Sequence, residues 1–145
     1  MLELIPNQLG YPLLSLLIFV PVIGAVVLLA VRDARAARWI ALVVSVVELG
    51  LCVPLLTNFD SSLAHMQFGE SMPWISDWNI HYKLGVDGIS VLFVGLTALL
   101  TVISIMVSWT AITDRVREFM VALLFLEAGM IGVFAALDLF LFYIF

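Results

Sequence analysis

The chain has 145 residues, of which 64% are hydrophobic and 12% are charged, whereas about 25% of the residues in a soluble domain are charged. Its mean hydropathy of +1.21 excludes an ordinary soluble fold and predicts an integral membrane protein. The formal net charge of −5 comes with no basic patch, so nothing in the sequence suggests nucleic acid as a partner.

Apolar runs predict an all-α membrane protein with one transmembrane domain. Four runs are about 19 to 21 residues long, the length of a helix that crosses a bilayer. A fifth run begins at residue 138 and reaches the end of the sequence after only a few residues. We therefore expect four complete helices plus the truncated start of a fifth, as the N-terminal part of a larger bundle. The predicted spans are 11–31, 39–57, 89–109, 119–137 and 138–145.

The basic residues predict the orientation of the chain. Five of the six lie in the two short loops 32–38 and 110–118, and only Lys83 lies in the long connection 58–88. Lysine and arginine are enriched in cytoplasmic loops. We therefore expect both short loops to be cytoplasmic, with the N-terminus and the connection 58–88 outside.

The aromatic residues agree with this orientation. Trp39 and Trp109 lie beside the two short loops, where tryptophan favours the membrane interface. Trp74, Trp78 and Tyr82 recur every four residues within the connection, which predicts a helical turn lying on the membrane surface. The alternative is that Trp74 and Trp78 pack the connection against the helix ends.

Glu48 and Glu127 are the strongest candidates for chemistry, because each lies near the centre of a predicted span. An intramembrane carboxylate is costly unless it faces protein or a water-filled path. One interpretation is a proton path, and the other is a permanently protonated glutamate that bonds to a neighbouring helix. The small residues Ala128, Gly132 and Ala136 follow Glu127 at four-residue intervals and predict a close helix contact beside it.

Hydroxyl residues form a stripe along one face of the third span. They are Ser90, Thr97, Thr101, Ser104 and Ser108. Such a stripe can order water along a proton path, but it is more often a packing face whose hydroxyls bond to carbonyls of the preceding turn. The packing interpretation is the favoured one.

The remaining polar residues suggest structural roles. Asp87 and Asp138 lie near the external ends of the third and fifth spans and are predicted to cap those helices. Cys52 is the chain's single cysteine, so we expect neither a disulfide nor an iron–sulfur cluster. His65 and His81 lie too far apart for a local zinc signature, and no nucleotide-binding motif is present.

Four segments resemble a known family. They are Lys83-Leu84-Gly85-Val86-Asp87-Gly88-Ile89-Ser90, the pair Ser108-Trp109, the stretch Leu126–Phe134 and the stretch Leu137–Tyr143. Together they closely resemble the M chain (chain 4) of the bacterial proton-pumping NADH:quinone oxidoreductase, respiratory complex I. The resemblance extends over the whole chain and is densest from Lys83 onward.

This resemblance implies an antiporter-like membrane subunit of a translocase in the bacterial inner membrane, with other complex I subunits and lipid as partners. NADH, flavin, iron–sulfur clusters and quinone would be bound by other subunits, so we expect no redox site and no activity in this chain alone. The family's key carboxylate follows a segment like 142–145, in a Trp-Glu pair. Its role is therefore not transferred to Glu127 or Glu48.

Two other functions are compatible with the sequence. Subunits of multisubunit sodium/proton antiporters resemble the same chains, and a purely structural membrane subunit would need no proton path. We also expect the chain to be poorly stable alone, because Glu48, Glu127 and the hydroxyl stripe would lack partners from further helices.

Overall fold

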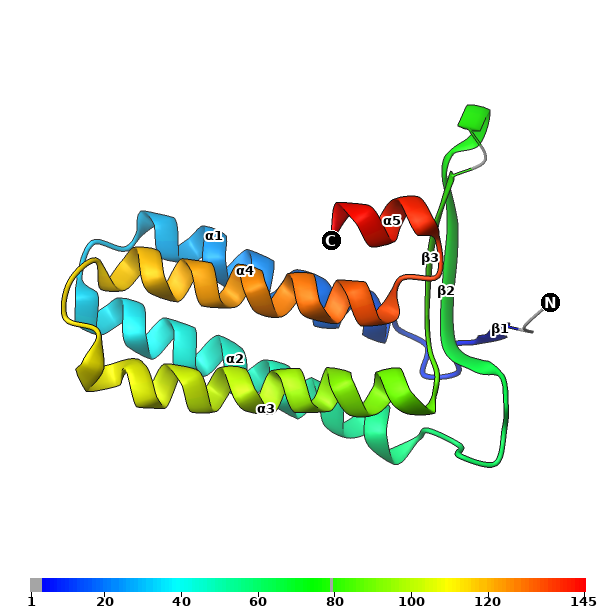
Figure 1. The fold of residues 1–145 in the computed structure, drawn as a ribbon, viewed down its shortest axis with the longest axis horizontal. Coiled ribbons are helices and arrows are strands. Elements are labelled where there is room, and N and C mark those ends of the chain that lie inside the picture. The colour runs from blue at the N-terminus through cyan, green and yellow to red at the C-terminus, as the bar shows by residue number, and fades with distance from the viewer. Residues whose placement is uncertain (1–3, 79) are drawn as a thin grey trace.

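Four long antiparallel helices form the body of the computed structural model, which describes residues 4–78 and 80–145 (Figure 1). All four are long and apolar enough to cross a membrane, which confirms the predicted membrane helices. Their ends differ by a few residues from the predicted ones. The helices are α1 (Leu13–Ala30), α2 (Ala34–Thr57), α3 (Gly88–Ala111) and α4 (Val116–Ala135).

Short side-chain caps set the starts of two of these helices. The Asp33 carboxylate accepts a hydrogen bond from the backbone N–H of Ala36 (2.8 Å) at the start of α2. At the start of α3, the Asp87 carboxylate accepts one from the N–H of Ser90 (2.7 Å), and this bond lowers the pKa of Asp87. The charge of Asp87 also meets the positive end of the α3 dipole.

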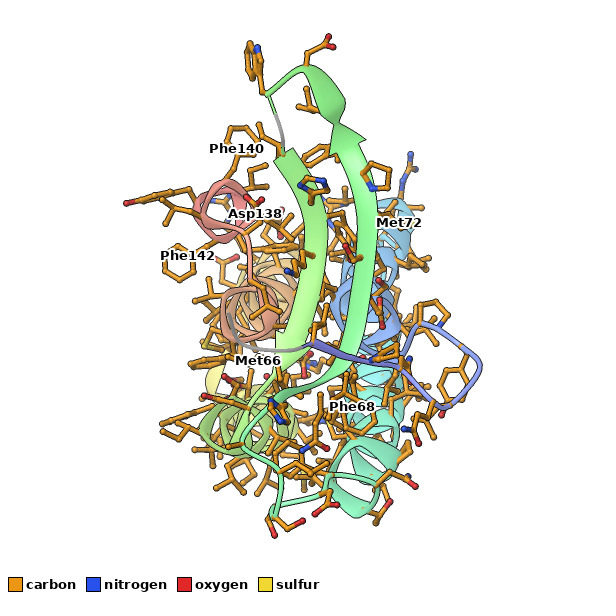
Figure 2. The ribbon with its side chains drawn as sticks, turned by 90° about the vertical axis from the view of Figure 1, so that its right-hand side faces the viewer. Met66, Phe68, Met72, Asp138, Phe140 and Phe142 are labelled. Atoms are coloured by element: carbon orange, nitrogen blue, oxygen red, sulfur yellow. The ribbon has the colours of Figure 1, made fainter. Side chains whose placement is uncertain are left out.

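A three-stranded sheet, which the sequence did not predict, crosses one end of the helices (Figures 1 and 2). Its order is β1-β2-β3, with β1 parallel to β2 and β2 antiparallel to β3. We call this end of the bundle the sheet end and the opposite end the loop end. The elements are β1 (Leu4–Pro6), β2 (Met66–Ile75), the 3-10 turn η1 (Ser76–Trp78) and β3 (Ile80–Val86).

The hairpin of β2 and β3 corrects the prediction of an interfacial helix. Trp74 and Tyr82 lie in opposite strands, and only Trp78 lies in the 3-10 turn. A spacing of four residues puts side chains on one face of a strand as well as on one face of a helix, so the aromatic pattern did not distinguish the two. Pairing of β2 with β3, such as Met72 opposite Tyr82, satisfies the backbone polar groups of the connection.

A short fifth helix, α5 (Leu139–Ile144), follows α4 and lies beside β3 (Figure 1). From the sheet end it turns back along the bundle. The backbone N–H of Leu137 donates to the carbonyl of Lys83 (2.9 Å), so the α4–α5 corner is bonded to β3. The ring of Phe145 packs on Gly132, where a side chain would collide with it.

The apolar core is divided into two clusters along the bundle. The sheet-end cluster includes Leu17, Cys52, Val94 and Ile131, one residue from each long helix. The loop-end cluster includes, in the same order of helices, Leu28, Ala41, Ile105 and Met120. In every helix a gap of one to three turns separates the two clusters, and the buried polar residues Ser45, Glu48, Thr101 and Glu127 lie in this gap.

A buried carboxylate layer as the candidate functional site

Glu48 of α2 and Glu127 of α4 occupy the gap between the two apolar clusters, and both are 0% exposed. Ser45, one turn before Glu48, is buried as well, and Thr101 of α3 is almost fully buried. We call these four residues the carboxylate layer. Each lies towards the middle of its helix, the depth at which a charge in a membrane is most costly.

The two carboxyl groups are electrostatic neighbours across the contact between α2 and α4. Glu48 lies within range of a charge on Glu127, and the Cys52 thiol lies within range of both carboxyl groups. Among the described residues, no side-chain or backbone group forms a hydrogen bond with any of their four oxygens. The arrangement therefore brings together two carboxyl groups that make no hydrogen bond with any described residue.

The hydroxyl groups of the layer are bonded to their own helices. Thr101 lies next to the Glu127 carboxyl but donates to the Thr97 carbonyl (3.0 Å). Ser45 likewise donates to the Leu42 carbonyl (3.0 Å). The Thr101 bond fits the packing interpretation of the hydroxyl stripe, because its hydroxyl proton is used within α3.

No basic residue balances the layer within the four described helices. Their arginines lie at the loop end, where Arg38 donates to the Ile112 carbonyl (2.8 Å) and Arg117 pairs with Glu118 (3.3 Å). Two adjacent carboxylates without a counter-charge repel each other, and an apolar interior solvates neither. The chemistry that this arrangement supports is the binding and release of protons.

Comparison with known proteins identifies the family, although no family model matches the chain. The chain is 48% identical to NADH-quinone oxidoreductase subunit M of Rhodobacter capsulatus over 139 residues, 92% of this chain and 27% of the relative. It is 42% identical to NADH-ubiquinone oxidoreductase chain 4 of Arabidopsis thaliana, with 91% of this chain and 27% of the relative covered. Over the matched region, this chain belongs to the subunit M/chain 4 family.

A third relative carries a different electron donor in its name. F(420)H(2) dehydrogenase subunit M of Methanosarcina mazei is 39% identical over 92% of this chain and 27% of the relative. The subunit M-type chain thus spans about a quarter of the length of these curated relatives, and the resemblance seen in the sequence is confirmed.

The two predicted capping residues of this subunit M-type chain lie at the sheet end, far from the carboxylate layer. Asp138 accepts hydrogen bonds from the N–H groups of Phe140 (2.8 Å) and His81 (3.3 Å). It thereby connects the start of α5 to β3, as its position in Figure 2 illustrates. Asp87 caps α3 at the end of the same strand. Both residues therefore join helices to the sheet.

Sequence reasoning missed Glu70, whose carboxylate caps α1 from strand β2. It accepts hydrogen bonds from the backbone N–H groups of Leu14 (2.8 Å) and Ser15 (3.2 Å) and from the Ser15 hydroxyl. The hydroxyls of Ser15 and Tyr82 lie 2.9 Å apart, and burial raises the pKa of Tyr82. The N-cap position of α1 is Pro12, which has no side-chain acceptor. No local signal reveals Glu70, because its partners lie 55 residues or more away.

A large cavity of about 790 Å³ lies beside Glu70 and not at the carboxylate layer. Its wall is mostly apolar and comes from α1, the hairpin and α5, with Phe19, Trp74 and Leu141 among the lining residues. Because its lining includes no residue of α2, α3 or α4, the size of this cavity does not mark the chemical site. The two buried carboxyl groups locate the site better, because an apolar groove has no need of buried carboxyl groups.

Proposed function

We propose that this chain is part of the antiporter-like, proton-translocating membrane subunit of an NADH:quinone oxidoreductase. In the intact complex, electron transfer from NADH to quinone drives the proton movement. The observation that carries the proposal is the pair Glu48 and Glu127, fully buried and without a counter-charge in a chain of the subunit M/chain 4 family. Such residues inside a membrane characterise proton relays.

In this proposal Glu127 and Glu48 belong to the proton path, and the chain binds protons and water but no cofactor. NADH, flavin, iron–sulfur clusters and quinone are held by other subunits of the complex. The relative named for F(420)H(2) supports this division of labour, since a similar chain serves a complex with a different named donor. The partners of the chain are the bilayer and the neighbouring membrane subunits.

The substitution Glu127→Gln in the full-length subunit tests the proposal. Glutamine preserves the size of the side chain but can neither take up nor release a proton at neutral pH. We expect assembly of the complex to persist while quinone-linked proton translocation slows by roughly 10²-fold, as on loss of a positioned acid–base group. NADH oxidation and proton uptake are measured together in membrane vesicles.

The matched control is Glu118→Gln, which removes an exposed carboxylate in the first turn of α4, at the loop end. It should leave both rates unchanged. Normal proton translocation by an assembled Glu127→Gln complex would support the purely structural alternative. Proton movement driven by a sodium gradient without NADH would support the sodium/proton antiporter.

We further propose that the sheet end of the bundle is external and the loop end cytoplasmic. The arginines of both short loops support this orientation. The edge-to-face contact of Trp39 with Trp109 (ring centroids 5.2 Å apart) supports a membrane interface at the loop end, whichever side that end faces.

Single cysteines in a background without Cys52 test this orientation. A membrane-impermeant maleimide should label Ser61→Cys in intact cells but Ala34→Cys only after permeabilisation. Both positions are exposed, so access to the reagent depends on the side of the membrane. The reverse pattern would refute the proposed orientation.

A further inference from the structure

Pro21 interrupts the hydrogen bonding of α1 on the face that packs into the bundle. Proline has no N–H, so it cannot donate to the carbonyl of Leu17, the residue four positions earlier. Leu17 and Pro21 are both buried, and they lie one above the other on the inward face of α1. The carbonyl that lacks its helical donor therefore lies in the bundle interior and not on the lipid side.

Gly24 shows which parts of the neighbouring helices lie level with this carbonyl. A Cβ atom built on Gly24 would lie 2.7 Å from the side chain of Val44 in α2 and 3.2 Å from that of Leu124 in α4. These three residues therefore lie at one height in the bundle. α1 runs away from the sheet, whereas α2 and α4 run towards it. A step of one helical turn towards the sheet therefore lowers the residue number in α1 and raises it in α2 and α4.

One turn closer to the sheet, these positions become Pro21 in α1, Glu48 in α2 and Glu127 in α4. Helical carbonyls point towards the C-terminus of their helix, so the Leu17 oxygen projects from the sheet side towards the turn of Pro21. The unused acceptor of α1 and the two unbonded carboxyl groups thus share one level.

A protonated carboxyl group needs an acceptor for its O–H when it is buried. In the layer, the Thr101 hydroxyl donates within its own helix. The carbonyls of α2 and α4 at this level precede no proline by four residues, so each can accept the N–H four positions later in its own helix. A backbone carbonyl that proline has freed is a strong neutral acceptor and carries no charge into the membrane interior.

We propose that the Leu17 carbonyl, freed by Pro21, accepts the hydrogen bond of the proton held by the Glu48–Glu127 pair. Pro21 is then a positioning residue of the carboxylate layer and not merely the site of a kink. This inference rests on the proposed proton-binding role of the pair. It adds a backbone group of α1 to a site whose side chains come from the other three helices.

The test is Pro21→Ala in the full-length subunit within the assembled complex. Alanine restores an N–H that can bond the Leu17 carbonyl, so the carboxyl O–H loses its acceptor. We expect the infrared C=O stretch of the protonated carboxyl to move to higher frequency, as it does when its O–H bond to an acceptor weakens. Glu48→Gln and Glu127→Gln assign the band through its loss.

Pro54→Ala is the matched control, since it restores the same kind of bond in α2. There the carbonyl four residues earlier belongs to Gly50, which is exposed on the outside of the bundle. This variant should leave the carboxyl band unchanged. If proline served packing alone, neither Pro21→Ala nor Pro54→Ala would move the carboxyl band.

Pro21→Gly provides a second variant, because glycine restores the N–H while tolerating a bent helix. An unchanged carboxyl band in either assembled variant would overturn the inference. So would failure of both variants to assemble, which would assign Pro21 to packing. If Glu127→Gln stops proton translocation while Pro21→Ala leaves the band in place, the proposed function stands and only the role of Leu17 falls.

Discussion

Replacing Glu70 with alanine is expected to detach the hairpin from α1. The Glu70 carboxylate accepts the first backbone N–H groups of α1 and the Ser15 hydroxyl, and Pro12 offers no side-chain substitute. Loss of a charged acceptor that leaves partly buried donors unbonded costs about 2–3 kcal/mol. The positive end of the α1 dipole also loses its counter-charge.

Trypsin applied from the sheet end measures this detachment. Lys83 is the single basic residue of the connection, and its backbone is held in β3 with its carbonyl bonded to Leu137. We expect cleavage after Lys83 to be fast in Glu70→Ala and slow in the parent. Asp77→Ala, which removes an exposed carboxylate from the tip of the same hairpin, serves as the control. Equal protection of all three proteins would contradict the role given to Glu70.

Replacing Gly24 with leucine should force α1 away from its neighbours. The first side-chain atom already meets Val44 at 2.7 Å and Leu124 at 3.2 Å, closer than carbon atoms pack. Overpacking of this kind costs typically about 1–3 kcal/mol, and the bulk of leucine places this site at the upper end. Because Gly24 lies one turn from the carboxylate layer, the separation would also disturb Glu48 and Glu127.

Gly50→Leu is the matched control for Gly24→Leu. It makes the same change in α2, where an added Cβ meets no atom within 4 Å. Cys52 is buried, so its reaction with a membrane-permeant maleimide reports opening of the bundle when other cysteines are absent. Labelling should accelerate in Gly24→Leu only. Equal labelling rates for the two variants would show that the close approach at Gly24 is unimportant.

The four long helices could be predicted from the sequence because each depends on its own apolar run. Glu48 and Glu127 could be singled out for the same reason, since depth within a span follows from position alone. Asp87 and Asp138 were recognisable because a helix cap bonds residues two or three positions away. Each of these features depends on residues that are close together in the sequence, so a sequence pattern is enough to predict it.

The sheet and the role of Glu70 could not be predicted, because both depend on contacts between distant segments. The pairing of β1 with β2 joins Leu4 to Met66, and nothing near either residue signals the other. The proximity of Glu48 to Glu127 likewise depends on how α2 packs against α4. Pro21 was visible as a break in α1, but its place beside the carboxyl groups required the register that Gly24 sets.

The hydrogen bonds of the hairpin also imply an order of assembly. Glu70 bonds to residues 55 and 56 positions before it, whereas His81 bonds to Asp138, 57 positions after it. During synthesis the hairpin can meet α1 early but must wait for α3 and α4 to emerge before α5 reaches β3. Contacts of such long separation form slowly. We therefore expect the sheet end to be the last part of the bundle to become rigid during folding.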